Sequence, residues 1–230
     1  VYYITFPYFI SRQKYDIIYR IGGIILTDML KNCQLCPRAC GADRTKSRGA
    51  CGAGVEIEAA RASLHMWEEP PISGTNGSGT VFFSHCSLGC VFCQNRKISR
   101  REAEGQNITA DALAKTFLSL EKKGAHNINL VTGAHYVPQI IEALQIARKQ
   151  GLSLPVVYNS SGYEQVETLQ LLDGHIDIYL PDYKYYSSYY AGLYSHAEDY
   201  REFAVPAIDE MVRQTGAPQF DKNGLLKRGT

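Results

Sequence analysis

Short apolar runs alternate with amphipathic segments along most of the chain. The apolar runs predict buried strands at residues 80–84, 127–131, 155–158 and 176–180. The amphipathic segments between and after them predict helices beginning at Thr109, beginning near Pro138, and spanning 164–172 and 199–214. Strands that alternate with helices are typical of βαβ units, so this part of the chain predicts a mainly parallel sheet.

The predicted fold class is α/β, with the sheet curling into a partial (β/α) barrel. Right-handed crossovers let the sheet curl toward a barrel, with its chemistry at the carboxyl ends of the parallel strands. Four strands do not close a barrel of the eight-stranded type. We therefore expect the barrel to be incomplete at its C-terminal side, with the native protein extending past Thr230.

The chain divides by composition into a sequence of regions. We expect an N-terminal packing segment at 1–30, a cysteine-rich metal module at 31–66, a linker loop at 67–79 and the partial barrel at 80–230. Charged residues between positions 12 and 20 interrupt the apolar N-terminus, which argues against a membrane span or a signal peptide. The linker assignment rests on the prolines and glycines of residues 68–80.

The charge balance excludes binding partners that need a strongly charged surface. The chain has 24 Lys and Arg against 23 Asp and Glu, a formal net charge of +1, whereas nucleic-acid and anionic-membrane binding depend on basic surfaces. The tyrosine-rich run at 183–190 resembles a platform for stacking bases, but no basic patch surrounds it. We expect a loop or short helix there, beside the substrate pocket.

Seven cysteines fall into two sets that use all of them. The odd number argues against a fully paired disulfide framework, and the close spacings favour metal binding in a reducing compartment, hence the cytoplasm. The first set is C-x2-C-x3-C-x10-C and the second is C-x3-C-x2-C. Their members are Cys33, Cys36, Cys40 and Cys51 in the first set, and Cys86, Cys90 and Cys93 in the second.

The three-cysteine set predicts a cluster with one open position. A cluster of four irons normally takes one thiolate per iron, so three cysteines leave one iron free for an outside ligand. The competing hypothesis is a Cys3His zinc site that uses His85 as its fourth ligand. No spacer separates His85 from Cys86, which disfavours that arrangement.

The four-cysteine set is complete and therefore saturated. Four thiolates suit structural zinc or a second iron–sulfur cluster equally, and the spacing does not decide between them. Glycines among the ligands permit the tight turns that direct backbone N–H groups at sulfur. A second cluster would relay electrons to the first, whereas zinc would only hold the module together.

Several motifs together resemble one enzyme family. The run Cys86-Ser-Leu-Gly-Cys90-Val-Phe-Cys93-Gln-Asn95, directly after the first predicted strand, resembles the signature loop of radical S-adenosylmethionine (radical SAM) enzymes. Further motifs resemble uncharacterised members similar to pyruvate formate-lyase activating enzyme. They lie at residues 32–40, 67–74, 125–131 and 177–184.

The resemblance implies a reductive cleavage of S-adenosylmethionine. A 4Fe-4S cluster at Cys86, Cys90 and Cys93 would bind S-adenosylmethionine, and one electron would release methionine and a 5′-deoxyadenosyl radical that abstracts hydrogen from a substrate. Further residues would contact this cofactor: Phe92, Thr132, Gly133, Asn159, Ser161, Asp182 and Lys184. Asp182 and Lys184 are two positions apart on a strand, so both can face a zwitterionic ligand.

The resemblance also implies an electron donor such as ferredoxin or flavodoxin, and a protein substrate if the enzyme is a glycyl radical activase. No side chain is assigned a catalytic role, and His135 is left out because a single loop histidine is more often structural. The alternative hypothesis is a non-enzymatic zinc or iron–sulfur module that serves a protein or RNA partner.

Overall fold

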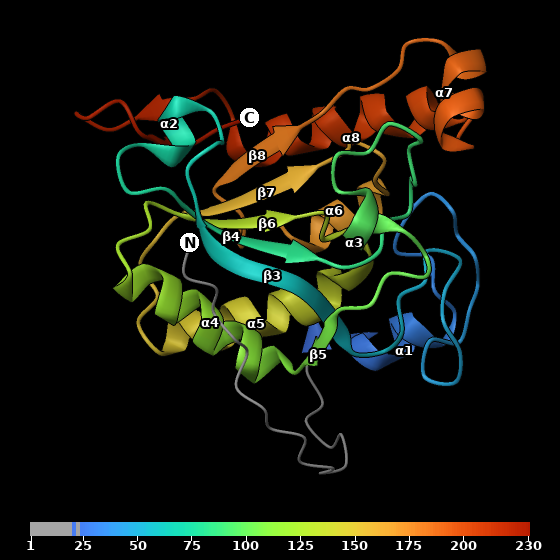
Figure 1. The fold of residues 1–230 in the computed structure, drawn as a ribbon, viewed down its shortest axis with the longest axis horizontal. Coiled ribbons are helices and arrows are strands. Elements are labelled where there is room, and N and C mark those ends of the chain that lie inside the picture. Colours follow the sequence, from blue (N-terminus) through green and yellow to red (C-terminus); the bar gives the residue numbers. More distant parts are fainter. Residues whose placement is uncertain (1–19, 22–23) are drawn as a thin grey trace.

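A six-stranded sheet forms the centre of the molecule (Figure 1). The structure, a computed structural model, describes residues 20–21 and 24–230, with side chains from Asp28 onward. The strand order is β5-β3-β4-β6-β7-β8. Most of the predicted N-terminal packing segment lies outside the described residues.

The four parallel strands predicted from the sequence are all present. They are β4 (Ser78–Phe83), β6 (Ile128–Val131), β7 (Val156–Ser160) and β8 (Ile178–Pro181), and each is parallel to the next. Their register aligns Phe82, Val131, Asn159 and Leu180 across the sheet near the carboxyl ends. The mainly parallel α/β sheet is thereby confirmed.

The predicted helices cover one face of this sheet. They are α4 (Ala110–Lys122), α5 (Val137–Lys149), α6 (Val166–Leu171) and α8 (Tyr200–Thr215), with the 3-10 turn η1 (Ala134–Tyr136) leading into α5. Thr109 caps α4 as predicted, since its hydroxyl accepts the Ala112 N–H at 3.2 Å. Figure 1 shows α4 and α5 side by side beneath the sheet, where Phe117 and Ile140 pack against Phe83 and Leu130 in the main core.

Two antiparallel strands extend the sheet beyond the predicted ones. β3 (Ile57–His65) pairs antiparallel with β4 on one side and with β5 (Gln106–Ile108) on the other. The alanines and the charged residues of β3 weaken its alternation of apolar and polar positions, so the sequence gives little strand signal there. Residues 57–65, assigned to the cysteine module by composition, thus belong to the central sheet.

The opposite face of the parallel strands is covered near their amino ends. The region predicted as a linker contains α2 (Pro70–Ser73), whose Ile72 packs against Val157 and Ile178. The hairpin of β9 (Gln219–Phe220) and β10 (Leu226–Arg228) lies beside it, and Gly229 forms a parallel bridge to Ile178. The covered amino ends leave the carboxyl ends as the place for a site.

The remaining elements are short. They are β1 (Arg20–Ile21), β2 (Ile24–Ile25), α1 (Leu26–Lys31), α3 (Arg96–Ser99) and α7 (Ser188–Ser195). Helix α7 forms where the tyrosine-rich run predicted a loop or short helix. Within the described part of the chain, none of the helices has both the length and the apolar character required to cross a bilayer.

Candidate functional site

The three-cysteine loop begins where β4 ends, at the carboxyl edge of the parallel strands. Cys86, Cys90 and Cys93 are unpaired thiols that share one apolar cluster with Tyr163 and Tyr200. The structure therefore brings the three cysteines together, as the spacing predicts, on a loop that follows a buried strand. A loop in this place faces whatever binds at the strand ends.

Hydrogen-bond donors surround the sulfurs of this loop. The Leu88 N–H donates to Cys86 Sγ at 3.4 Å, and the Ser99 hydroxyl donates to Cys93 Sγ at 3.3 Å. Burial raises the pKa of Cys86, while the N–H groups of Gly89 and Leu88 act in the opposite direction. Donors aimed at thiolates stabilise metal-bound sulfur and tune the potential of a cluster.

Two arginines hold the loop in place. Arg100 donates to the carbonyls of Gly89 and Cys90, the latter at 2.9 Å. Arg38, from the four-cysteine module, donates through Nε to the Ser87 carbonyl at 3.0 Å. The loop conformation is thus supported by side chains from two separate parts of the chain.

His85 is engaged away from the thiols. Its Nε2 lies 3.1 Å from Glu58 Oε2, and its Nδ1 lies 3.2 Å from the Arg100 carbonyl. With both ring nitrogens occupied by oxygen partners, His85 does not complete a Cys3His zinc site. The three-cysteine set therefore receives no fourth ligand from His85.

The predicted cofactor-contacting residues all lie at the carboxyl ends of the parallel strands. Thr132 and Gly133 follow β6, Asn159 is in β7, and Ser161 directly follows that strand. Thr132 adopts a left-handed φ of 62°, and a Cβ at Gly133 would lie 2.8 Å from Ile140 Cδ1. The chain therefore turns sharply at Thr132, and a side chain at position 133 would require the end of Ile140 to shift.

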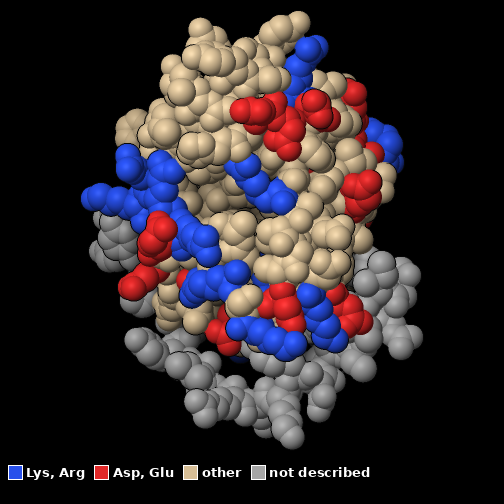
Figure 2. Space-filling model, turned by 90° about the vertical axis from the view of Figure 1, so that its right-hand side faces the viewer, with Lys and Arg blue, Asp and Glu red and all other residues tan. Residues whose placement is uncertain are grey.

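Two charged residues and an aromatic ring complete this edge. Lys184 Nζ lies 2.8 Å from Asp182 Oδ2, so the two predicted ligand-binding groups form an ion pair with each other just after β8. Phe92 is 55% exposed, with its ring 6.1 Å from that of Tyr185. Figure 2, which views the carboxyl ends of the strands, shows a hollow bordered by basic side chains.

The four-cysteine module gathers its thiols on tight turns. Ala39 N–H donates to the Cys36 carbonyl and Gly41 N–H to the Cys33 carbonyl, at 2.9 and 3.0 Å. A Cβ at Gly49 would lie 3.6 Å from Cys51 Sγ and 3.7 Å from Cys40 Sγ. All four predicted ligands are thus in one small region.

The module's thiols have unequal acidity. Burial raises the pKa of Cys36 to about 12 and also raises the pKa of Cys51. Burial acts on Cys40 in the same direction, but the N–H groups of Ala50, Ala42 and Cys40 itself outweigh it and lower its pKa. Buried thiols with high pKa values ionise when a metal binds them.

A buried arginine in the four-cysteine module indicates whether an anionic metal centre would fit there. Arg44 is 2% exposed, and no carboxylate of the described residues lies within ion-pair distance of it. Its guanidinium donates to the Gly54 and His135 carbonyls, and Nη1 lies 3.9 Å from Cys33 Sγ. A buried cation needs an anionic partner, which four metal-bound thiolates would provide.

One further finding concerns single metal ions. Among residues 20–21 and 24–230, no three His, Cys, Asp or Glu side chains are grouped closely enough to hold one ion. Thiols with N–H donors suit an iron–sulfur cluster at the three-cysteine loop, and the four thiols and buried cation of the other set suit an anionic metal centre.

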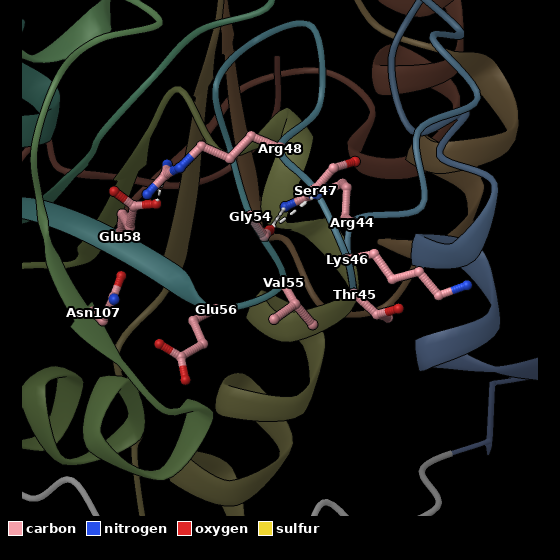
Figure 3. Close-up of a pocket in the computed structure, with 10 residues that line it drawn as sticks. All are labelled: Arg44, Thr45, Lys46, Ser47, Arg48, Gly54, Val55, Glu56, Glu58 and Asn107. Carbon is pink, nitrogen blue, oxygen red and sulfur yellow. Dashed lines mark hydrogen bonds and ion pairs between the residues drawn. The ribbon is translucent and has the colours of Figure 1, made fainter.

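The pocket drawn in Figure 3 lies beside the four-cysteine module and apart from the strand ends. Its volume is about 290 Å³, and residues 44–48, 54–56, Glu58 and Asn107 line it. Figure 3 shows Arg44 bonded to Gly54 and Arg48 bonded to Glu58. None of the predicted cofactor-contacting residues belongs to it.

Sequence reasoning missed the side chains behind the strand ends. Arg38 lies inside the four-cysteine motif and Tyr200 inside a predicted helix, but neither these patterns nor the position of Tyr163 indicates that the three side chains contact one another. Glu164 was also missed. It is buried behind β7, and burial raises its pKa to about 7. Its Oε1 accepts the Ser160 hydroxyl at 2.6 Å.

Comparison with known proteins agrees with this arrangement. The sequence model of the radical SAM superfamily matches residues 80–210, which is more than half of the chain. The chain belongs to the radical SAM superfamily. The matched range includes the three-cysteine loop, most of β4 and the other parallel strands, and it leaves out the four-cysteine module.

One relative extends the similarity beyond the superfamily range. The chain is 31% identical over 166 residues to an uncharacterized protein of Methanocaldococcus jannaschii, an overlap of 70% of this chain and 48% of the relative. The chain therefore spans about half the length of that relative. No solved structure matches the chain.

Proposed function

We propose that the protein reductively cleaves S-adenosylmethionine at a 4Fe-4S cluster held by Cys86, Cys90 and Cys93. Such a cluster, when bound, supplies the electron that breaks the sulfonium bond and yields methionine and a 5′-deoxyadenosyl radical. The observation that carries the proposal is the set of three free thiols on one loop at the carboxyl edge of the parallel strands. The superfamily match agrees with it.

In this proposal the chain's own residues bind the cofactor and exclude water. Leu88, Gly89 and Ser99 donate to the sulfurs, and Tyr163, Tyr185 and Tyr200 pack around them. Asp182 and Lys184 would exchange their mutual ion pair for the amino and carboxylate groups of S-adenosylmethionine. Thr132, Gly133, Asn159 and Ser161 would contact the rest of that molecule, and Phe92 its adenine.

The test compares two variants in the same loop. Cys90→Ala is expected to abolish 5′-deoxyadenosine formation and to remove the iron of this site, because one ligand of three is lost. Leu88→Ala is the matched control, since it removes a buried side chain of the loop but no ligand. Continued 5′-deoxyadenosine production by the Cys90 variant would contradict the proposal.

We propose further that the substrate is a protein, with hydrogen abstracted from a glycine of a partner enzyme. The support is an exposed aromatic surface beside the loop. Tyr189 is 71% exposed, Tyr190 stacks on Tyr194 at 5.9 Å, and Tyr194 contacts Phe92. Exposed aromatic surfaces next to a site are typical of protein docking.

An activase assay tests this finer proposal. Reduced enzyme is mixed with S-adenosylmethionine and candidate glycyl radical proteins, and the glycyl radical is sought by electron paramagnetic resonance. A Tyr189→Ala variant should lower the yield of radical while leaving 5′-deoxyadenosine formation without a partner unchanged. No radical with any candidate protein would count against the activase role alone.

The four-cysteine module would hold a second 4Fe-4S cluster, with ferredoxin or flavodoxin as electron donor. The buried Arg44 beside Cys33 supports an anionic metal centre there. Protein prepared without oxygen should be brown and contain about eight irons per chain if both sets take a four-iron cluster. Colourless protein with two zinc ions would favour the non-enzymatic alternative.

A further inference from the structure

The hydroxyl of Tyr200 lies where β7 and β8 end. From α8, Tyr200 Oη lies 2.8 Å from the carbonyl oxygens of both Ser161 and Asp182, which share its single proton, and it accepts the backbone N–H of Lys184 at 2.8 Å. Ser161, Asp182 and Lys184 are three of the residues expected to contact S-adenosylmethionine. One buried hydroxyl therefore fixes two strand ends that would share a single ligand.

Tyr200 is itself held by a stack of side chains. Its ring stacks on Tyr163, with centroids 6.0 Å apart and planes at 17°. The guanidinium carbon of Arg38 lies 5.3 Å from the centroid of the Tyr163 ring. Arg38, Tyr163 and Tyr200 are called the Arg38 stack below; cation–π and ring contacts of this kind stabilise such an arrangement.

Arg38 connects this stack to both cysteine sites. It lies between Cys36 and Cys40 in the four-cysteine module, and its Nε donates to the Ser87 carbonyl within the three-cysteine loop. Its Nη1 and Nη2 donate to the His196 and Ser195 carbonyls at the end of α7, the latter at 2.9 Å. A single guanidinium thus fixes the module, the loop and α7 relative to one another.

We propose that Tyr200 is a positioning residue for S-adenosylmethionine and that the four-cysteine module acts on the cofactor site through the Arg38 stack. The proposal rests on the proposed function and deepens it. Without the hydroxyl, the Lys184 N–H and two carbonyls lose their common partner, and the strand ends become less ordered. A ligand that contacts both ends must then order them when it binds, which weakens its affinity.

The Tyr200→Phe variant tests the proposal, because it keeps the ring and removes the hydroxyl. In reconstituted, oxygen-free protein, the Kd for S-adenosylmethionine measured by isothermal titration calorimetry is expected to rise about tenfold. The KM for S-adenosylmethionine in 5′-deoxyadenosine formation is expected to rise by the same factor. The kcat and the iron content are expected to remain those of the wild type.

Tyr179→Phe is the matched control. It also removes one buried hydroxyl, which donates to Gln214 Oε1 at 2.6 Å on the helix-covered face of the sheet. If lost stability alone weakened binding, the Kd for S-adenosylmethionine would rise in both variants. The proposal expects it to rise only for Tyr200→Phe.

Arg38→Lys tests the link to the four-cysteine module. Lysine keeps the positive charge but cannot reproduce the planar contacts to three carbonyls and a ring. The Kd is expected to rise about fivefold, and the double variant with Tyr200→Phe is expected to show less than the product of the two effects, since both act through one stack. Should Tyr200→Phe fail to fold, this variant carries the test.

The outcomes separate this proposal from the one on which it rests. Wild-type protein that neither binds S-adenosylmethionine nor forms 5′-deoxyadenosine would overturn both. Wild-type protein that does both, together with an unchanged Kd and KM in Tyr200→Phe and Arg38→Lys, would overturn the positioning role alone. A fall in kcat or iron content at constant Kd would overturn it as well.

Discussion

The two cysteine sites differ in what surrounds their sulfurs. The three-cysteine loop follows a buried strand and packs against tyrosine rings, with two arginines bonded to its carbonyls. The four-cysteine module has turns instead of regular structure, and its buried cation, Arg44, contacts two carbonyls, the Cys33 sulfur and the Tyr136 ring. We therefore expect the first site to keep its conformation without metal and the second to depend on metal for its stability.

Removing one cysteine from each site should show the difference in metal dependence most strongly. Cys36→Ser is expected to lower the free energy of unfolding by about 4 kcal/mol or more, because the module loses its metal and leaves Arg44 buried without an anion. At two to four degrees per kcal/mol, the Tm falls by about 10 °C.

Cys90→Ser, the matched variant in the loop, should lower the Tm by only a few degrees. Thermal unfolding followed by circular dichroism measures both. Equal losses for the two variants would contradict the difference in metal dependence.

Arg44→Met examines the buried cation directly. Removing the guanidinium from beside the metal-bound thiolates is expected to cost about 3 kcal/mol of unfolding free energy and to reduce metal content at the module alone. Lys46→Met is the control, since its ion pair with Asp43 is solvent-exposed and contributes less than about 1 kcal/mol. Denaturant titration of both variants gives the comparison.

His135 joins the two regions and gives them a pH dependence. Its carbonyl accepts Arg44, its Nε2 lies 2.8 Å from the Ser84 carbonyl, and burial lowers its pKa to about 3. Below about pH 6.5 the His135 imidazole is protonated in the unfolded chain but stays neutral in the folded protein. The free energy of unfolding therefore falls by about 1.4 kcal/mol for each pH unit.

His135→Gln should remove this part of the slope. The free energy of unfolding of the wild type is expected to fall by about 2 kcal/mol more than that of the variant between pH 7.5 and pH 5. Urea titrations at the two pH values measure it. Identical slopes would show that the histidine is already protonated in the folded protein.

Ser99→Ala makes the smallest change, at the loop. Its hydroxyl donates to Cys93 Sγ. Such a hydrogen bond is expected to stabilise the reduced state of the proposed cluster, which is more negative, over the oxidised state by about 1 kcal/mol. The midpoint potential is expected to fall by about 40 mV for a one-electron couple. A redox titration followed by electron paramagnetic resonance measures it, and the signal of the four-cysteine module should not shift.

The elements predicted correctly from the sequence are those that carry a clear local signal. The four parallel strands and the cap at Thr109 carry clear apolar periodicity or a capping side chain. The three cysteines could be grouped from the sequence because metal ligands that share one loop lie close together along the chain, and their role as cluster ligands remains a prediction. Strand β3 was not predicted, because its small and charged residues weaken the alternation of apolar and polar positions.

The side chains that organise the site could not be predicted, for a physical reason. Tyr200 and Arg38 are distant in sequence from the residues they hold, and their value comes from one hydroxyl and one guanidinium placed by tertiary packing. No periodicity or spacing encodes such contacts. The predicted domain division remains a prediction, with β3 placed by the structure in the central sheet.

The pairing of β3 with β4 has a consequence for how the protein folds. These strands lie close in sequence, with only the α2 segment between them. Each parallel pair is separated by at least one whole helix, so its strands pair over a longer loop and later in folding. The antiparallel pair is thus the most local part of the sheet. Because β3 directly follows one cysteine site and β4 directly precedes the other, we expect a growing chain to bring both metal sites together before the parallel strands form.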